Sequence, residues 1–108
     1  MTIEIEGRLA ALGDVRPLPN GTPVRECVVE TREVWKDGST HANPIAIEFR
    51  GSRAPLLDAH AVGDEVRVKA DIQGRIARTT GRRFVTLSGW RIEAATAPAP
   101  AQPQAPNP

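Results

Sequence analysis

Four arginines lie close together in the second half of the chain, within residues 75–83, a stretch that contains no acidic residue. A guanidinium group can hold a phosphate through two hydrogen bonds and can stack its plane on a nucleobase. A local concentration of arginine is therefore typical of a surface that binds nucleic acid. The alternative is an ordinary solvated face, because G+C-rich coding sequences supply arginine readily. The four residues are Arg75, Arg78, Arg82 and Arg83.

The nearly neutral composition hides an uneven distribution of charge along the 108 residues. The formal net charge is +1, with 14 Lys or Arg against 13 Asp or Glu, and all but two of the cations are arginine. Residues 1–49 sum to −3, residues 50–93 sum to +4, and residues 94–108 carry no charge. Because the positive charge is local, the small total does not exclude a nucleic-acid partner.

Trp35 is the best candidate for stacking on a base, because Arg32 and Lys36 lie beside it in the sequence. Base–aromatic stacking contributes about 1–3 kcal/mol per base in proteins that bind single strands. A position at a barrel rim or a subunit contact would equally explain an exposed Trp. Arg50 and Arg53 follow an apolar stretch and would extend the binding surface, unless they are simply solvated.

The other three aromatic rings are predicted to serve packing. Phe49 and Phe84 each continue an apolar alternation, which predicts that both face the core. Trp90 is predicted to lie in the core or at a dimer interface. With no Tyr in the chain, few rings remain for recognition. Such a binder should depend on arginine–phosphate contacts more than on stacking, and its affinity should fall with added salt.

No arrangement of residues predicts catalysis, a metal site or a cofactor. His41 and His60 stand in different segments, and neither has a zinc-ligand spacing to Cys27. The serines lack the Gly-x-Ser-x-Gly pattern, and the glycines do not form a phosphate loop. We therefore expect a protein that is not an enzyme. Cys27, the single cysteine, is expected to be a small buried hydrophobic residue without a disulfide, which suits a reducing cytosol.

Period-two alternation of apolar residues predicts five strands. Asn20-Gly21 favours a tight turn before the second strand, and residues 36–39 favour another after it. The alternation slips at residues 27–29, which predicts either burial of both faces or a bulge, and Gly89 is placed to supply a bulge in the last strand. The predicted strands are residues 3–9, 24–35, 45–49, 66–72 and 84–93.

A short helix is expected between the third and fourth strands. Residues 54–60 are rich in Ala and Leu, Ser52 is available as a cap, and Pro55 stands near the start, so one or two helical turns fit. This order predicts an all-β, five-stranded OB-fold, a Greek-key barrel with a helix between strands three and four. An SH3-like barrel is of similar length but normally lacks that helix. Residues 74–83 form the predicted loop between the last two strands.

The chain is predicted to contain one OB-fold domain, residues 1–93, and a disordered tail of Ala, Pro and Gln, residues 94–108. The tail has almost no means of burying apolar area, and it is either an inert extension or a docking segment. Neither a signal peptide nor a membrane-spanning stretch is evident. We therefore expect a soluble cytoplasmic protein associated with the nucleoid.

The order of several short motifs resembles the bacterial single-stranded DNA-binding proteins. In that family a Pro-Asn-Gly turn precedes the second strand and a Trp closes it, as in residues 14–24 and 30–37 here. Later segments are similar to a related family of small uncharacterised OB proteins, and primosomal replication protein N, a dimeric OB protein, is a third likeness. The later segments are residues 44–51, 56–57, 62–66 and 90–93.

The resemblance covers residues 3–93 and implies sequence-independent binding of single-stranded DNA, a homodimer or homotetramer, and contacts with replication or recombination proteins. It assigns Trp35 to stacking and residues 75–83 to holding the strand. The chain departs from the family at Arg50, where an aromatic residue is common, at Ile76 and Ala77, where a Trp is frequent, and in its uncharged tail.

We therefore expect single-stranded DNA binding through a basic OB groove, in replication, recombination or repair. Two alternatives stay open. One is an OB-fold interaction or assembly module that does not bind nucleic acid, and the other is a protein that binds single-stranded RNA.

Overall fold

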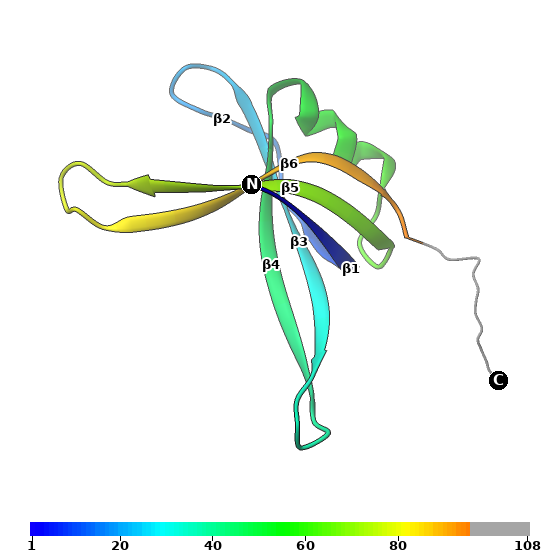
Figure 1. Cartoon of the computed structure of the whole chain (residues 1–108). Helices are drawn as coiled ribbons and strands as arrows, with labels where there is room; N and C mark the ends of the chain where they lie inside the picture. The colour runs from blue at the N-terminus through cyan, green and yellow to red at the C-terminus, as the bar shows by residue number, and fades with distance from the viewer. Residues whose placement is uncertain (96–108) are drawn as a thin grey trace.

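The computed structural model describes residues 1–95 and is built almost entirely of strands (Figure 1). The predicted tail, residues 94–108, lies outside the described residues apart from Ala94, which ends the last strand, and Ala95. In chain order the elements are β1 (Thr2–Leu12), β2 (Arg16–Pro17), β3 (Pro23–Val34), β4 (Thr40–Arg50), η1 (Gly51–Ala59), β5 (Glu65–Ile76) and β6 (Arg83–Ala94).

The strands close into a five-stranded barrel with the short helix η1 between β4 and β5. The sheet order is β1-β5-β6-β4-β3-β2, and β1 also pairs with β3, which closes the ring. Between β4 and β6 the barrel is joined by a single parallel residue pair, Glu48 with Ser88. The two-residue β2 pairs with the start of β3 and lies in the connection between the first two barrel strands. This architecture confirms the predicted OB-fold.

The core is built from the inward-facing positions of the alternating strands. Val66, Val68 and Ala70 of β5 are buried at every second residue, as the alternation predicts, and Phe49 of β4 is fully buried among them. Gly89 of β6 lies against this ring: a Cβ placed on Gly89 would come within 2.5 Å of Phe49 Cε1. The prediction that Phe49 faces the core is therefore confirmed.

Two bulges adjust the barrel, one in β1 opposite the predicted residues 27–29 and one in β6 beside Gly89. Opposite β3, the β1 register slips between Leu9 and Ala11, which lets Leu9 and Leu12, three residues apart, both face the core. The extra residue of the first bulge is thus in β1 rather than in β3. In the last strand Ala70 pairs with Gly89 and Lys69 with Arg91, so Trp90 is the extra residue. Gly89 therefore adjoins a bulge, as predicted.

The helix is a 3-10 helix rather than an α-helix, and it begins earlier than predicted. Gly51, at φ +61, leaves β4 sharply, so Ser52 lies inside the first turn, and no side chain caps the helix. The predicted Ser52 cap is therefore wrong. Ala54 and Leu57, three residues apart, are both buried, which matches the three residues per turn of a 3-10 helix. Leu57 joins the barrel core.

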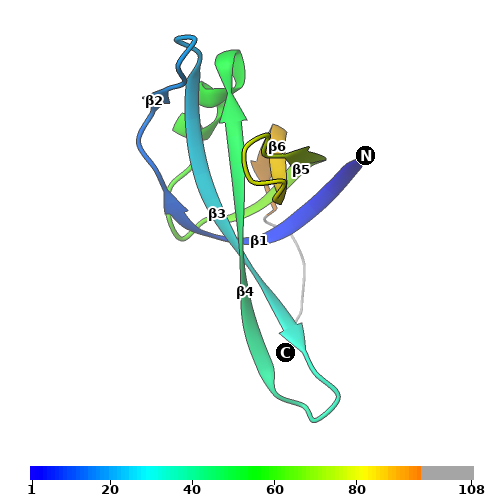
Figure 2. The same ribbon diagram turned by 90° about the vertical axis from the view of Figure 1, so that its left-hand side faces the viewer.

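Two hairpins extend beyond the barrel as arms (Figures 1 and 2). Past Glu30, β3 pairs only with β4, and past Asp71, β5 pairs only with β6. We call residues 31–43 the β3–β4 arm and residues 72–87 the β5–β6 arm. In Figure 1 the first points down and the second points left.

The β5–β6 arm corrects the predicted loop at residues 74–83. Gly74, Arg75 and Ile76 belong to β5 and Arg83 begins β6, so the turn contains only residues 77–82. β4 likewise begins at Thr40, ahead of the predicted residue 45. Both faces of an arm meet water, so the apolar alternation that predicts a strand is missing there.

No helix within residues 1–95 is long and apolar enough to cross a membrane.

Candidate nucleic-acid interface

The arginines of the barrel wall are neutralised by carboxylates of the same chain. Arg67 is the clearest case, with guanidinium nitrogens 3.0 Å from Glu4, 3.5 Å from Glu6 and 3.2 Å from Glu93. These contacts raise the pKa of Arg67, mainly through its hydrogen bond to Glu93, and lower the pKa of Glu93 for the same reason. The other paired arginines are Arg8, Arg16, Arg25, Arg50 and Arg91.

Most cations that the sequence singled out have no carboxylate partner. Within residues 1–95 no Lys or Arg of the two arms forms an ion pair, and neither does Arg53 in η1 or Lys69 in β5. Residues 72–92 contain no acid at all, so nothing in the β5–β6 arm itself can neutralise its arginines. These charges are available to external anions. The unpaired cations of the arms are Arg32, Lys36, Arg75, Arg78, Arg82 and Arg83.

On the β5–β6 arm two arginines flank an exposed ring. Arg75 pairs across the hairpin with Phe84, and the guanidinium carbon of Arg75 is 6.0 Å from the ring centroid. Arg82 approaches the same ring at 5.5 Å. A compact turn positions them: Ala77 N donates to Arg82 O and Gly81 N donates to Ala77 O, each at 2.8 Å, with Gly81 at φ +71. Cations and an aromatic face are thus presented together.

Phe84 is 39% exposed, so the prediction that it faces the core is wrong. At Phe84, β6 pairs only with β5 and has not yet reached the barrel, so no core lies beneath the ring. Phe84 is therefore a candidate stacking residue that the sequence analysis missed. The sequence feature that could have indicated exposure of Phe84 is its position directly after the basic residues Arg82 and Arg83, where an apolar core would not be expected.

At the base of this arm, Arg50 joins the group. Arg50, Gln73, Gly74, Arg75 and Thr86 line one surface cavity of about 430 Å³. Arg50 also donates to Glu48 Oε1, from Nε at 3.2 Å and from Nη2 at 2.8 Å. The structure therefore brings Arg50 to the foot of the β5–β6 arm, although part of its charge is used within the chain.

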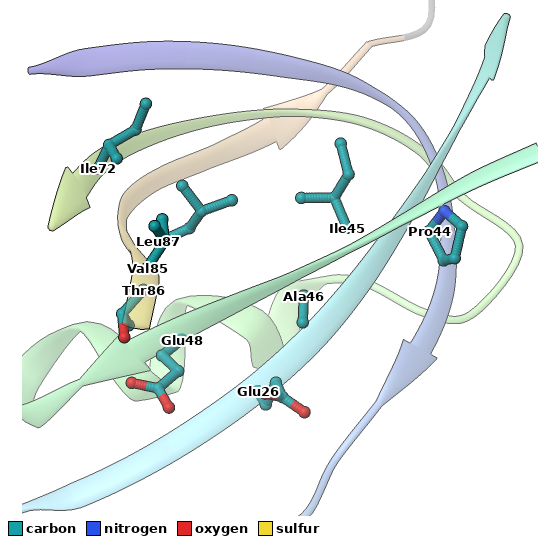
Figure 3. Close-up of a pocket in the computed structure, with 9 residues that line it drawn as sticks. All are labelled: Glu26, Pro44, Ile45, Ala46, Glu48, Ile72, Val85, Thr86 and Leu87. Atoms are coloured by element: carbon teal, nitrogen blue, oxygen red, sulfur yellow. The ribbon is translucent and has the colours of Figure 1, made fainter. Parts of the chain in front are cut away.

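A cleft of about 390 Å³ opens between β4 and β6, where the barrel is least paired (Figure 3). Apolar side chains from three strands line it, and the carboxylates of Glu26 and Glu48 stand at one side. Glu26 and Glu48 face each other in the β3–β4 register. Glu48 is paired with Arg16 and Arg50, so within residues 1–95 the uncompensated negative charge in the middle of this face is that of Glu26, and the free cations lie on the arms at its ends. The apolar residues are Pro44, Ile45, Ala46, Ile72, Val85 and Leu87.

The β3–β4 arm carries the second group of predicted residues. Trp35 is 54% exposed at the hairpin tip. Its backbone N–H donates to Ser39 O, and its backbone carbonyl accepts from Gly38 N. Trp35 and Lys36 line one shallow depression, and Arg32 lies further back, opposite Ala42. These three residues share an arm.

The predicted site residues thus form two groups and one outlier. Arg32, Trp35 and Lys36 lie on one arm, and Arg50 adjoins the arginines of the other. Arg53 is in η1, at the end of the molecule away from the tip that carries Trp35 (Figures 1 and 2). His41, which stacks on Trp35, is a second residue that the sequence analysis missed. The sequence feature that could have indicated this contact is the turn at residues 36–39, which brings His41 back beside Trp35.

The thiol of Cys27 lies buried in the barrel core. Cys27 is 1% exposed, and burial raises the pKa of its thiol to about 12. The predicted buried, unpaired cysteine is confirmed. Within residues 1–95 no three His, Cys, Asp or Glu side chains gather closely enough to hold a metal ion.

The barrel and the helix between its third and fourth strands define an OB-fold. Residues 4–93 match one family model, described as a domain of unknown function (DUF3127). The chain belongs to that family. No curated protein matches the chain in sequence.

Three solved structures share this fold at low sequence identity. PriB from Ralstonia solanacearum is 17% identical, with a TM-score of 0.59 over 88% of this chain and 97% of that one. A deletion mutant of the single-stranded DNA-binding protein from Thermus aquaticus is 19% identical, with a TM-score of 0.62 over 88% and 50%. The mitochondrial single-stranded DNA-binding protein Rim1 from S. cerevisiae is 14% identical, with a TM-score of 0.71 over 88% and 95%.

Proposed function

We propose that the protein binds single-stranded DNA without sequence preference, through its two arms and the cleft between them. The observation that carries the proposal is Phe84, an exposed ring flanked by Arg75 and Arg82, neither of which has a carboxylate partner within residues 1–95. Single-strand binders combine cations for the backbone with aromatic faces for bases. Two of the structural neighbours are named as single-stranded DNA-binding proteins, which supports the same function.

The residues take different roles in this proposal. The arginines of the β5–β6 arm hold phosphates, and Phe84 stacks on a base. On the other arm Trp35 stacks, with Arg32 and Lys36 beside it for phosphates. Arg50 guides the strand past the foot of the β5–β6 arm, and Arg53 extends the basic surface toward η1. The phosphate-binding arginines of the β5–β6 arm are Arg75, Arg78, Arg82 and Arg83.

The wider setting is part of the same proposal. We place the protein in DNA replication, recombination or repair, as a non-enzymatic homo-oligomer in the cytoplasm, in contact with the nucleoid and with replication or recombination proteins. The domain that binds is residues 1–93.

Titration of a fluorescently labelled oligo-dT by anisotropy, at low and moderate salt, tests the function. We expect binding at low salt, with log affinity falling linearly against log salt by about 0.7 per phosphate contact. Replacing Arg75, Arg78, Arg82 and Arg83 together by alanine should weaken binding and flatten that slope by up to about 3. A wild-type protein that does not bind at low salt would overturn the proposal.

A matched control removes cations that are already neutralised. The double variant Arg67→Ala and Arg91→Ala deletes two charges from the barrel wall, where both are paired with Glu93. Its salt slope should stay close to that of the wild type. If binding depended on total charge alone, the control variant would lose as much affinity for each charge removed as the arm variant does. Oligo-U in place of oligo-dT tests the RNA alternative, and retained assembly without any binding would indicate an interaction module.

A further inference from the structure

The tip of the β3–β4 arm holds an aromatic pair that the proposed function leaves unexplained. The rings of Trp35 and His41 are stacked, with centroids 3.5 Å apart and planes inclined by 25°. His41 is the second residue of β4, and Trp35 is the first residue after β3. The imidazole therefore covers one face of an indole that is 54% exposed.

A short hydrogen-bond chain anchors the imidazole. His41 Nε2 lies 2.8 Å from Ser39 Oγ, and Ser39 Oγ donates to Asp37 Oδ1 at 2.5 Å. Since the hydroxyl hydrogen is directed to Asp37, the oxygen is left to accept from Nε2–H. Ser39 N also donates to Asp37 Oδ1, at 2.9 Å. The two hydrogen bonds from Ser39 lower the pKa of Asp37, so a charged carboxylate ends this hydrogen-bond chain.

We propose that His41 is a positioning residue, which holds the Trp35 ring so that one nucleobase stacks on its uncovered face. The base, the indole and the imidazole then form three layers, and Lys36, which shares a depression with Trp35, contacts the adjoining phosphate. This inference rests on the proposed function, because it assumes that the arm meets a single strand. It adds the ligand of the tip, a single base, and the residue that prepares the tip for it.

The physical reason is the cost of ordering an exposed side chain on binding. An indole without a neighbour would lose rotamer freedom when a base stacked on it, and a ring already held in place loses less. Immobilising one such side chain changes affinity by about twofold to tenfold. We expect an effect of this size from removing His41.

The experiment uses the full chain with Trp90→Phe, so that Trp35 is the only Trp. In this background we compare His41→Ala, His41→Phe and Trp35→Ala, with His60→Ala as the matched histidine control. Labelled oligo-dT reports affinity, and Trp35 emission reports its surroundings. We expect His41→Ala to bind about twofold to tenfold more weakly, His41→Phe to regain most of the loss through its planar ring, and Trp35→Ala to lose more than either.

Acrylamide quenching of Trp35 emission shows whether the rings are stacked in solution, because the stacked imidazole covers one face of the indole. Trp35 should be quenched more strongly in His41→Ala than in the parent and in His60→Ala. His41→Phe should be quenched as weakly as the parent, because its ring replaces the imidazole.

The outcomes separate the two proposals. A parent that does not bind oligo-dT refutes the proposed function. If the parent binds and His41→Ala binds equally well, His41 does not position the ring. If Trp35→Ala binds as well as the parent, no base stacks at the tip, and DNA binding then depends on the other arm.

Discussion

Arginine has two different roles in this protein, and the neighbouring carboxylates decide which. Arg67 sits among Glu4, Glu6 and Glu93 and stabilises the barrel wall. Arg75 and Arg82 instead lie beside the ring of Phe84 without any acid nearby in the arm. A guanidinium in this second setting keeps its capacity to bind phosphate and to stack.

Phe84→Ala should separate binding from folding at the residue scale. The ring is exposed on an arm, so its loss should change the free energy of unfolding by less than about 1 kcal/mol. Losing one base stack, in contrast, should weaken oligo-dT binding by about 1–3 kcal/mol. Urea unfolding and anisotropy titration measure the two quantities. Val62, an exposed residue outside the arms and the cleft, supplies the control, and an equal loss of affinity in Val62→Ala would argue against stacking.

At the scale of elements, the bulge in β6 and the ring of Phe49 depend on each other. Gly89 pairs with Ala70 at the bulge, and its missing side chain leaves the space that Phe49 occupies. The last strand can therefore cross the core closely only with glycine at this position.

Gly89→Ala should destabilise the barrel. The new Cβ would approach Phe49 ring atoms at 2.5 Å, and overpacking of this kind costs about 1–3 kcal/mol. Gly74→Ala is the matched control, because nothing lies within 4 Å of a Cβ there. Thermal or urea unfolding of both variants gives the comparison. Equal stabilities would mean that the ring moves aside without cost.

The paired strands β3 and β4 carry a local repulsion beside the cleft. Glu26 and Glu48 face each other across the hairpin, and Glu48 is compensated by Arg16 and Arg50, whereas no ion pair within residues 1–95 includes Glu26. Like charges directly opposite each other destabilise a sheet, and they also repel phosphates.

Glu26→Gln should therefore strengthen binding of oligo-dT at low salt by about twofold to fivefold, and the gain should shrink as salt screens the charge. Anisotropy titration at two salt concentrations measures the effect. Glu6→Gln serves as the control, because Glu6 pairs with Arg67 on the barrel wall. An unchanged affinity in Glu26→Gln would indicate that the strand does not pass the cleft.

At the scale of the whole molecule, carboxylates compensate the barrel wall and cations remain free on the arms. Closure of the strands into a ring buries one core with Cys27 inside it, and the hairpins that outgrow the ring remain in water. Charge and shape thus divide the molecule into a charge-compensated barrel and two arms whose cations have no ion-pair partner within residues 1–95.

The thiol of Cys27 should report unfolding of the whole barrel. Burial raises its pKa from 9.0 to about 12, so the folded state favours the protonated thiol. Stability should therefore be unaffected below about pH 9 and should fall as pH rises from about 9 to 12, because the unfolded state then releases the proton more readily. Urea unfolding at a series of pH values measures this, and Cys27→Ala should lack that component.

A thiol reagent gives an independent measurement on the same residue. At pH 8 the native protein should react slowly with Ellman's reagent, and the protein in urea should react at once, because Cys27 is 1% exposed. Immediate reaction of the native protein would show that the barrel opens locally at β3.

The barrel could be predicted from the sequence, whereas the arms could not. Alternation in residues 66–70, the Asn20-Gly21 turn and the glycine at residue 89 predicted strands, a hairpin connection and a bulge that the structure contains. Each reflects a local steric rule or a buried face, which leaves a periodic trace in the residues. The exposed Phe84, the His41–Trp35 stack and the acidic pair beside the cleft came only from the tertiary structure. They depend on where β3 to β6 leave the barrel and on which residues meet across strands, and no local pattern records either.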